Sequence, residues 1–309
     1  MAKSTILQLS YSGATLSGEV NNLGAKIAAQ ATDFTYTDVA SGQSDSISIS
    51  MHDIGWDWLK YYKPCKGAVI GASIILQNEG SFECGDFVVD DVSFGRSSSP
   101  LKCGIGAVSV PVMNDFKYLQ RTKTWESATL KSIAGEIARS ANVELYYDAG
   151  TIKIAELEQS SQTDSAFLYS LCERYGLGMK VYKNRFVIFD ITAYEAKPAV
   201  HFFTEQDLTS WEWNETIDGT YTGVEFKYTD PDAKKKDSIS VTIGSPGRMY
   251  YMNAQASSRH DAELQAKAKV NAANRSAETL NLTIAARPEI AATQCIAIVG
   301  LGVIDGKYY

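Results

Sequence analysis

The three histidines and five cysteines are the usual first candidates for nucleophiles and metal ligands. His52, His201 and His260 form no HxxxH pair, and none pairs with a cysteine at a zinc-binding interval. No CxxC pair occurs among the cysteines, which are Cys65, Cys84, Cys103, Cys172 and Cys295. Such an odd, scattered set favours reduced, buried thiols in a cytoplasmic setting over a nucleophile or a metal site.

Acidic side chains offer two further candidates for catalysis. Asp90 and Asp91 are adjacent in an expected strand, so their side chains should point to opposite faces and cannot act as a pair. Glu212 and Glu215 flank Trp213, but their spacing alone does not support a glycosidase pair, and a solvated surface explains them better.

Aromatic, basic and glycine-containing segments also have simpler explanations than chemistry. A sugar-binding platform would suit the aromatic group, but such residues more often anchor a core or a subunit interface; they are Trp56, Trp58, Tyr61 and Tyr62. Lysines 234–236 are typical of a soluble loop tip. GSPG (244–247) lacks the nucleophile elbow, and GIGA (104–107) lacks the third glycine of a dinucleotide site. We therefore predict no catalytic residue, no cofactor-binding residue and no metal ligand.

Charge and hydropathy exclude several other classes of protein. The net charge is −7, made up of −5 in residues 1–115, +1 in residues 116–198 and −3 in residues 199–309. This balance is not that of a basic nucleic-acid-binding domain or of a disordered chain. No apolar window of 18 residues occurs, so the sequence predicts no membrane-spanning helix, and its first residues do not resemble a signal peptide.

Residues 1–115 are predicted to be mostly β. In DSISISM, Ile47, Ile49 and Met51 alternate with polar residues and should share one face. GAVIGASIIL (67–76) is more continuously apolar, which is typical of a strand covered on both sides. CGDFVVDDVSFG (84–95) should form another strand, opened by Gly85. Glycine and serine residues interrupt these strands at short intervals, which favours a barrel or a sandwich.

Residues 116–198 are predicted to form a compact α+β unit. TKTWESATLKSIAGEIARSA (122–141) predicts a helix with an apolar stripe that begins at Leu130 and a cap at Thr124 or Ser127. Two short strands follow in VELYYD and TIKIAEL, and then a helix capped by Thr163 or Asp164 that ends near Gly176. A hairpin should turn at Lys183-Asn184.

Residues 199–309 return to β, with one more helix. Strands are predicted at 224–228 and 238–244 and in the segments LNLTIAARP and CIAIVGLG. The helix should run from Ser258 to about Ala277, and its small residues predict close packing on a sheet.

The two outer thirds share a weak internal echo. Pro64 precedes an apolar strand and Gly85-Asp86-Phe87 opens another, while Pro288 precedes CIAIVG and Gly306-Lys307-Tyr308 opens another. This echo suggests a duplication. The second copy stops one residue after Tyr308, so we expect the last domain to be incomplete at its C-terminus and to leave an edge strand unpaired.

Taken in order, five segments resemble the late control protein D family, the baseplate hub of contractile phage tails. They are FTYTDVASGQSDSISISMHD, KYYKPCKGAVIGASI, CGDFVVDDVSFG, RTKTWESATLKSIAGEIARSANVELYY and EQSSQTDSAFLYSLCERYGLGMKVYKNRFVIFD. The last includes a glutamine, Gln159 or Gln162, ahead of the Asp-x-x-Phe-Leu start of the second predicted helix, which reaches Leu168. Relatives of this family occur in R-type bacteriocins and in the hub region of type VI secretion spike proteins.

The resemblance implies a β-rich α+β fold of two tube-like β-barrel domains, residues 1–115 and 199–309, with the α+β module 116–198 inserted between them. It implies a non-enzymatic homotrimer that adapts a hexameric tail tube to a trimeric central spike. Implied partners are the tube, spike, tape measure and baseplate wedge proteins, and no membrane. DNA would pass through the channel without specific binding. Assembly would take place in the bacterial host cytoplasm, and the protein would reside in the tail baseplate of a virion or bacteriocin particle. A cell-wall-binding or peptidoglycan-degrading tail component is the alternative.

Overall fold

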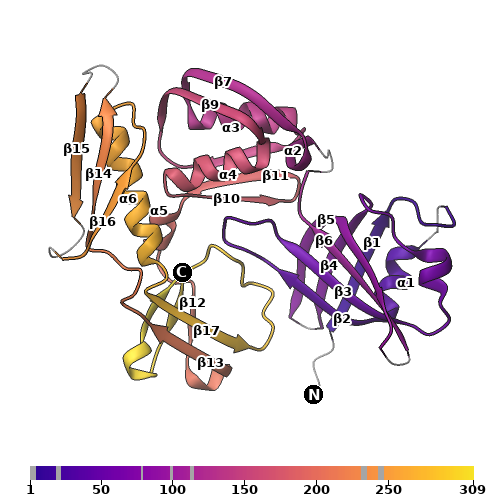
Figure 1. Ribbon diagram of the computed structural model, residues 1–309. Coiled ribbons are helices and arrows are strands. Elements are labelled where there is room, and N and C mark those ends of the chain that lie inside the picture. The colour runs from indigo at the N-terminus through magenta and orange to yellow at the C-terminus, as the bar shows by residue number, and fades with distance from the viewer. Residues whose placement is uncertain are drawn as a thin grey trace.

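The protein is a β-rich α+β protein, as predicted, and three regions stand out along the chain. The computed structural model describes residues 5–18, 22–77, 79–97, 100–111, 115–230, 235–242 and 247–309. Figure 1 shows a curled sheet in indigo and purple, a helix-bearing unit in magenta and pink, and a last part in orange and yellow. Within the described ranges, no helix combines the length and hydrophobicity that crossing a membrane would need.

The first part is a curled antiparallel sheet of six strands in the order β1-β4-β5-β6-β3-β2. A helix, α1 (Leu23–Gln30), packs on β1, and a short helical turn, η1 (Trp58–Tyr62), follows β3. The strands are β1 (Thr5–Ser12), β2 (Ala31–Thr37), β3 (Ser46–Asp53), β4 (Val69–Leu76), β5 (Gly80–Gly95) and β6 (Leu101–Val108).

Alternation in β3 is confirmed, because Ile47, Ile49 and Met51 are all buried in one cluster. Two expectations for this sheet were wrong. The strand β5 already begins at Gly80, and Gly85 instead lies at a bulge with φ of 111°. β4 buries mainly one face, since its intermediate side chains alternate with buried ones over most of its length.

Gly24 allows α1 to lie directly on β1. A Cβ at this position would lie 2.4 Å from the carbonyl oxygen of Leu9, which cannot move without moving the strand. We expect Gly24→Ala to be destabilising by about 1–3 kcal/mol, because overpacking outweighs the gain of up to about 1 kcal/mol in helix propensity. Gly135→Ala in α3 is the matched control, because its Cβ would meet only Leu145 at 3.8 Å. Urea unfolding should show opposite signs for the two variants.

The middle part contains a shorter helix than predicted. Residues 120–129 form a strand, β7 (Gln120–Thr129), and only Leu130–Ser140 are helical, as α3. The cap is Thr129, whose side chain accepts a hydrogen bond from Ser132 N, rather than Thr124 or Ser127. The apolar stripe that predicted the helix begins only at Leu130, and the β-branched and aromatic residues ahead of it favour a strand.

The rest of the middle part follows the prediction closely. Thr163 caps α4 (Asp164–Arg174), Gly176 has φ of 69°, and Lys183-Asn184 form a tight turn with positive φ at both residues. The other elements are β8 (Glu144–Asp148), β9 (Lys153–Thr163), β10 (Leu177–Tyr182), β11 (Arg185–Asp190) and two short helices, α2 (Asp115–Tyr118) and α5 (Ile191–Glu195).

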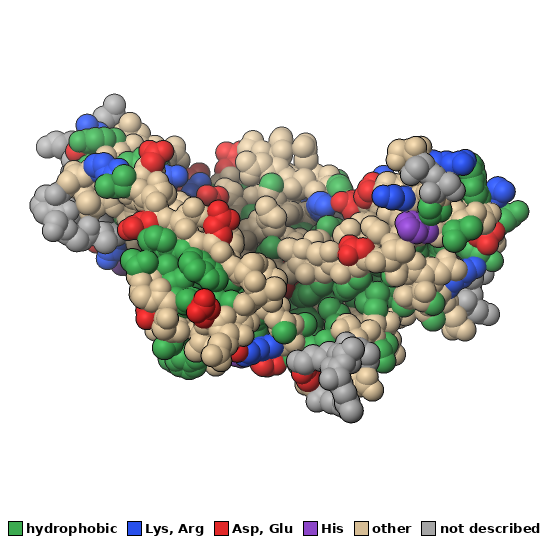
Figure 2. Space-filling model, turned by 90° about the horizontal axis from the view of Figure 1, so that it is seen from below, with side chains coloured by type: hydrophobic (Ala, Val, Ile, Leu, Met, Phe, Trp, Pro, Cys, Tyr) green, Lys and Arg blue, Asp and Glu red, His purple; other side chains and the backbone are tan. Residues whose placement is uncertain are grey.

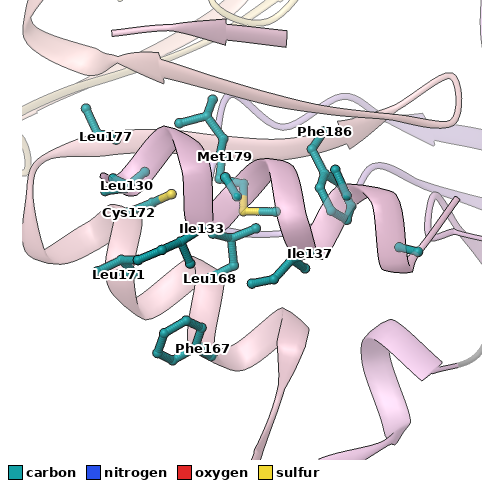
Figure 3. Close-up of a cluster of buried hydrophobic side chains, with 14 of the residues drawn as sticks. Leu130, Ile133, Ile137, Phe167, Leu168, Leu171, Cys172, Leu177, Met179 and Phe186 are labelled. Carbon is teal, nitrogen blue, oxygen red and sulfur yellow. The ribbon is translucent and has the colours of Figure 1, made fainter. Parts of the chain in front are cut away.

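The two main helices of this part enclose its hydrophobic core against β10 and β11. Figure 3 shows side chains from α3 and α4 converging with those of the strands, including Leu168, Met179 and Phe186. β9 pairs with β7, whereas β8 lies parallel to β11. The two short strands predicted in VELYYD and TIKIAEL, which are β8 and β9, therefore belong to different sheets.

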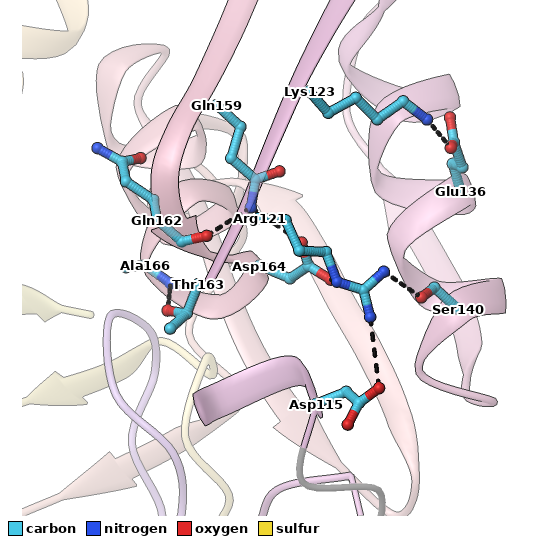
Figure 4. A network of polar contacts seen from close by, with 10 residues as sticks. All are labelled: Asp115, Arg121, Lys123, Glu136, Ser140, Gln159, Gln162, Thr163, Asp164 and Ala166. Carbon is cyan, nitrogen blue, oxygen red and sulfur yellow. Dashed lines mark hydrogen bonds and ion pairs between the residues drawn. The ribbon is translucent and has the colours of Figure 1, made fainter. Parts of the chain in front are cut away.

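A buried polar network fixes the start of α4. Gln159 is buried and donates from Nε2 to Asp164 Oδ1 over 2.9 Å, which identifies Gln159 as the glutamine of the predicted motif. Arg121 lies beside the same carboxylate, with Nε 3.4 Å from Asp164 Oδ2, and also reaches Asp115 and Ser140 (Figure 4). The motif that carried the family resemblance therefore has a structural role at this helix start.

The last part forms three separate sheets in its described residues, unlike the single sheet of the first part. Residues 223–274 contribute one of them together with α6 (Arg259–Asn274), capped by Ser258 as predicted, and they lie in sequence between β13 and β17. The strands are β12 (His201–Phe203), β13 (Leu208–Glu215), β14 (Gly223–Asp230), β15 (Lys235–Thr242), β16 (Met249–Asn253), β17 (Glu278–Ile284), β18 (Ile296–Ile298) and β19 (Gly306–Tyr308), with short 3-10 turns η2 (Glu205–Asp207) and η3 (Gly302–Ile304).

Hydrophobic clusters follow the three predicted ranges. One cluster lies within residues 1–115, one within 116–198, and two within 199–309, where α6 and its sheet pack apart from the strands β12, β13, β17, β18 and β19. The domain boundaries themselves stay a prediction.

Candidate functional site

Lys180 on β10 is the centre of a buried ion cluster between the first and middle parts. Its Nζ pairs with Asp38 and lies 3.0 Å from Asp45 Oδ2, and only 7% of the residue is exposed. Asp45 is fully buried, and its Oδ1 accepts a hydrogen bond from Val39 N over 3.0 Å. One ammonium group therefore faces two carboxylates in a place that is largely closed to solvent.

The loop that carries both carboxylates, residues 38–45, joins all three parts of the chain. Ala292 N in the last part donates to Asp38 Oδ2 over 2.8 Å. Gly42 N donates to the carbonyl of Met179 in the middle part over 3.1 Å. Ser109, just after β6, donates from N to the carbonyl of Asp45 and from Oγ to the carbonyl of Val181. We call this set of contacts the junction.

The titratable groups of the junction are suited to connecting segments of the chain rather than to transferring protons. Burial raises the pKa of Asp45 above its usual value, and the neighbouring Lys180 ammonium opposes that rise. Burial, with Asp38 and Asp45 next in effect, raises the pKa of the Tyr36 hydroxyl, which therefore stays protonated. Lys180, Asp38 and Asp45 are largely buried, and each carboxylate also accepts a backbone hydrogen bond. The triad therefore connects segments of the chain and offers little access to a substrate.

The raised pKa of Asp45 sets the sign of a pH effect. The folded chain binds this proton more tightly than the unfolded chain, so the associated stability is present at acid pH and is lost as the pH rises through the pKa of folded Asp45. Relative to Asp45→Asn, the wild type should therefore gain free energy of unfolding when the pH falls from about 7 toward 4.5. Urea unfolding of both proteins at several pH values measures this. A relative loss for the wild type on acidification would contradict it.

The histidines and cysteines do not converge on a site. His52 is exposed on β3, His201 lies 3.1 Å from Gln294 Oε1, and His260 is exposed at the start of α6. Within the described residues, no three His, Cys, Asp or Glu side chains are arranged as metal ligands. Four cysteines are buried and Cys65 is half-buried. Burial raises the pKa of Cys84 to about 11 and of Cys103 and Cys172 to about 12, which opposes thiolate formation.

The carboxylate candidates are also separate. Asp90 and Asp91 lie at a bulge in β5 that leaves both exposed, and Tyr118 donates a hydrogen bond to Asp90. In the register of β13 with β17, Glu212 lies opposite Asn281 and Glu215 lies opposite Glu278. The two glutamates therefore lie on opposite faces of β13, which does not suit a pair acting on one substrate.

The aromatic group divides between core and surface. Trp58 is buried and donates from Nε1 to Gln30 Oε1 over 2.6 Å, and Tyr62 lies under the ammonium of Lys26. Trp56 and Tyr61 remain exposed, so the four rings do not form one platform. GIGA lies within β6. Residues 244–246 and 234 lie outside the described residues, as do the side chains of Lys235 and Lys236.

An open hollow of about 640 Å³ lies over β3, β5 and β6. Its lining includes Ser50, Gly104, His52, Arg96 and Lys102. No carboxylate occurs among the described residues that line it, so these bases lack an acidic partner for acid–base chemistry. The junction, which sequence reasoning did not find, is the more extensively built feature.

Comparison with known proteins gives matches in sequence and in fold. No family model matches the chain. A probable baseplate hub protein of Escherichia phage 186 is 24% identical over 216 residues, which cover 68% of this chain and 54% of that protein. The chain thus spans about half the length of this curated relative.

Solved phage tail proteins share the fold over almost the whole chain. A 43 kDa tail protein of prophage MuSo2 from Shewanella oneidensis has a TM-score of 0.70 at 11% identity, over 97% of this chain and 91% of that one. A tail protein from Neisseria meningitidis has a TM-score of 0.69 at 10% identity, over 98% and 90%. An E. coli component of the type VI secretion system has a TM-score of 0.55 at 8% identity, over 99% and 68%. The chain therefore has the fold of phage tail proteins, and its predicted resemblance to the baseplate hub proteins is confirmed.

Proposed function

We propose that the chain is a structural baseplate hub protein of a contractile tail. The observation that carries this proposal is the agreement of a sequence match to a baseplate hub protein with a fold match over nearly the full chain to two tail proteins. The junction adds a physical reason, because a component that transmits force through a tail needs its parts tied by contacts that solvent does not weaken. The protein would then lie in the tail baseplate of a phage or bacteriocin particle.

As a finer proposal, the hub is a homotrimer that adapts a hexameric tail tube to a trimeric spike. Three chains supply six outer parts around one axis, and the contacts then alternate between one chain and the next. In support, the segments of the sequence echo form antiparallel neighbours in both outer parts, β4 with β5 and β18 with β19. The tube, spike, tape measure and wedge proteins are the proposed partners.

One side of β13 and β17 is suited to a channel wall, because it pairs Glu212 with Asn281. On β3 and β6 the side opposite the core holds Ser48, Ser50 and Gly104 together with His52 and Lys102, so that side is not acidic. If the polar side of β13 and β17 lines the channel, it neither attracts phosphates nor adheres to apolar segments, and DNA would pass without specific binding. A ring lumen lined mainly by Lys and Arg would contradict this.

Reconstruction of tail particles that contain the chain tests the role and the stoichiometry together. The proposal expects three copies in a ring between tube and spike, with residues 1–115 and 199–309 in equivalent positions. Six copies per ring, or outer parts that do not superpose, would refute the adaptor. A peptidoglycan digestion assay tests the alternative, and activity that one point substitution abolishes would favour the enzyme.

A further inference from the structure

Two Asp-Gly pairs occur in the sequence, in nearly identical local contexts. They are Asp218-Gly219 in IDGTY (217–221) and Asp305-Gly306 in IDGKY (304–308), and no asparagine precedes a glycine. Glycine has no side chain to shield its backbone nitrogen, so the carboxyl group of a preceding aspartate can approach that nitrogen closely. A mobile Asp-Gly pair is therefore prone to rearrange to isoaspartate. Because their neighbouring residues are so similar, only the structure distinguishes the two pairs.

Asp218-Gly219 lies at the tip of the loop that leads from β13 to β14. Ile217 is 75% exposed, and both Asp218 and Gly219 are exposed beside it. Figure 2 shows Asp and Glu side chains scattered singly over the surface on the left of the view, where the last part lies. Solvent therefore reaches both residues of this pair.

The reacting atoms of Asp218-Gly219 are free of contacts that would hold them apart. The N–H of Asp218 donates to Thr216 Oγ1 over 3.1 Å, but its carboxylate forms neither a hydrogen bond nor an ion pair with any residue that the structure describes. Gly219 has φ of 74°, and a Cβ added to it would meet no atom within 4 Å outside its chain neighbours. The side-chain carbon Cγ of Asp218 and the nitrogen of Gly219 can therefore approach each other.

Asp305-Gly306 is held in place at both residues. Asp305 Oδ1 accepts a hydrogen bond from Leu301 N over 2.7 Å. Gly306 is the first residue of β19 and lies opposite Ile298 of β18. Ile304, which precedes the pair, is buried in a cluster of the last part. A reaction between the carboxyl group and the following nitrogen would first have to break the hydrogen bond at the carboxylate and disturb a paired strand.

We propose that the folded chain forms isoaspartate at Asp218 and protects Asp305. The Gly219 nitrogen forms a bond to Cγ of Asp218, and its proton leaves as water together with one carboxyl oxygen and a second proton from the carboxyl group or the solvent. The product is a five-membered succinimide ring. A water molecule then opens this ring at one of its two C–N bonds. Cleavage of the original peptide bond gives isoaspartate, whereas cleavage of the new bond restores aspartate.

Isoaspartate lengthens the main chain by one methylene group, which the loop has to absorb between two fixed ends. At one end Thr216 N donates to the carbonyl of Ala277 over 2.7 Å, and at the other Tyr221 N donates to Asn274 Oδ1 over 2.8 Å. Between them, Thr220 closes the turn with hydrogen bonds from its N and Oγ1 to one carbonyl. The added length should therefore open this turn into the solvent and leave α6 and its sheet in place.

Peptide mapping of the full chain, kept folded at physiological temperature, tests the assignment. Isoaspartate is detected by its changed retention at unchanged mass and by enzymatic methylation of its free α-carboxylate, and the succinimide is detected by the loss of one water. We expect conversion at Asp218 to be faster than at Asp305 by about tenfold or more, since Asp305 reacts only when its local structure opens. In urea, where neither pair is held, the two should convert at similar rates.

Two conservative variants are the matched controls. Asp218→Glu keeps the charge but would have to close a six-membered ring, so methylation of the folded chain should fall almost to background. Asp305→Glu should leave methylation unchanged, and melting temperatures check that both variants are folded. Should Asp305→Glu fail to fold, the comparison of the two wild-type peptides decides by itself.

Three outcomes would overturn the proposal. They are equal rates at the two pairs in the folded chain, faster conversion at Asp305, and conversion of Asp218 in urea but not in the folded chain. Amide hydrogen exchange at Tyr221 tests the confinement of the change to the turn. It should be the same before and after conversion, and faster exchange in the converted protein would show that the end of the loop is released as well.

Discussion

Replacing Lys180 with methionine is expected to lower the free energy of unfolding by about 3–5 kcal/mol, because it leaves two carboxylates without their cation in the junction. Asp45 is fully buried and cannot recover its lost partner from water. The hydrogen bond of loop 38–45 to the last part and its ion pairs with the middle part depend on the same two carboxylates. The loss should therefore also loosen the parts relative to one another, and urea unfolding with limited proteolysis between them would measure both effects.

Lys183→Met is the matched control for this substitution. Lys183 lies on the same hairpin and pairs with Glu83 over 2.9 Å, but both side chains are largely exposed, at 43% and 70%. Exposed pairs are screened by solvent and contribute little to stability, so this variant should unfold almost as the wild type does. Adding Asp45→Asn to Lys180→Met should recover part of the loss, since one of the two uncompensated charges is removed. Equal losses for the two lysines would contradict a special role for the junction.

Local patterns in the sequence predicted the elements that have clear local causes. The hairpin at Lys183-Asn184, the Thr163 cap and the left-handed Gly176 each depend on a few neighbouring residues, and all three were found. The helix start at residue 122 was wrong because the apolar stripe begins only at Leu130, while Trp125 and its neighbours pair as a strand with β9. Periodicity locates a buried face more reliably than it locates the ends of an element.

The junction could not be predicted because its members are distant in sequence. Lys180 and Asp38 are 142 residues apart, and no local pattern marks either as buried. Lysine is rarely buried unless it is paired, so an isolated lysine in a strand predicts a solvent-exposed side chain.

Phe226→Ala and Phe186→Ala are expected to unfold different parts of the chain. Phe226 is fully buried in the cluster between α6 and its sheet, and Phe186 is fully buried in the core of the middle part (Figure 3). Removing a buried phenylalanine costs about 3–5 kcal/mol of the unit that contains it. Because the two clusters share no residue, each variant should lower the temperature of a different calorimetric transition by more than about 10 °C.

The contacts of α6 with the middle part determine how independently the middle and last parts can unfold. Tyr175 donates a hydrogen bond to Asp261 over 2.9 Å, and a Cβ on Gly176 would lie 3.2 Å from Ala268. Arg275, just after α6, also pairs with Glu195 of α5, so the last part contacts both α4 and α5 of the middle part. A contact of this extent aligns two units without making their cores one. If both variants instead shift a single transition of the whole chain, the middle and last parts are one cooperative body, and their division into separately folding units is wrong. Two transitions that respond separately would mean that each core can fold while its neighbour is disrupted, as expected of a module inserted between two outer domains.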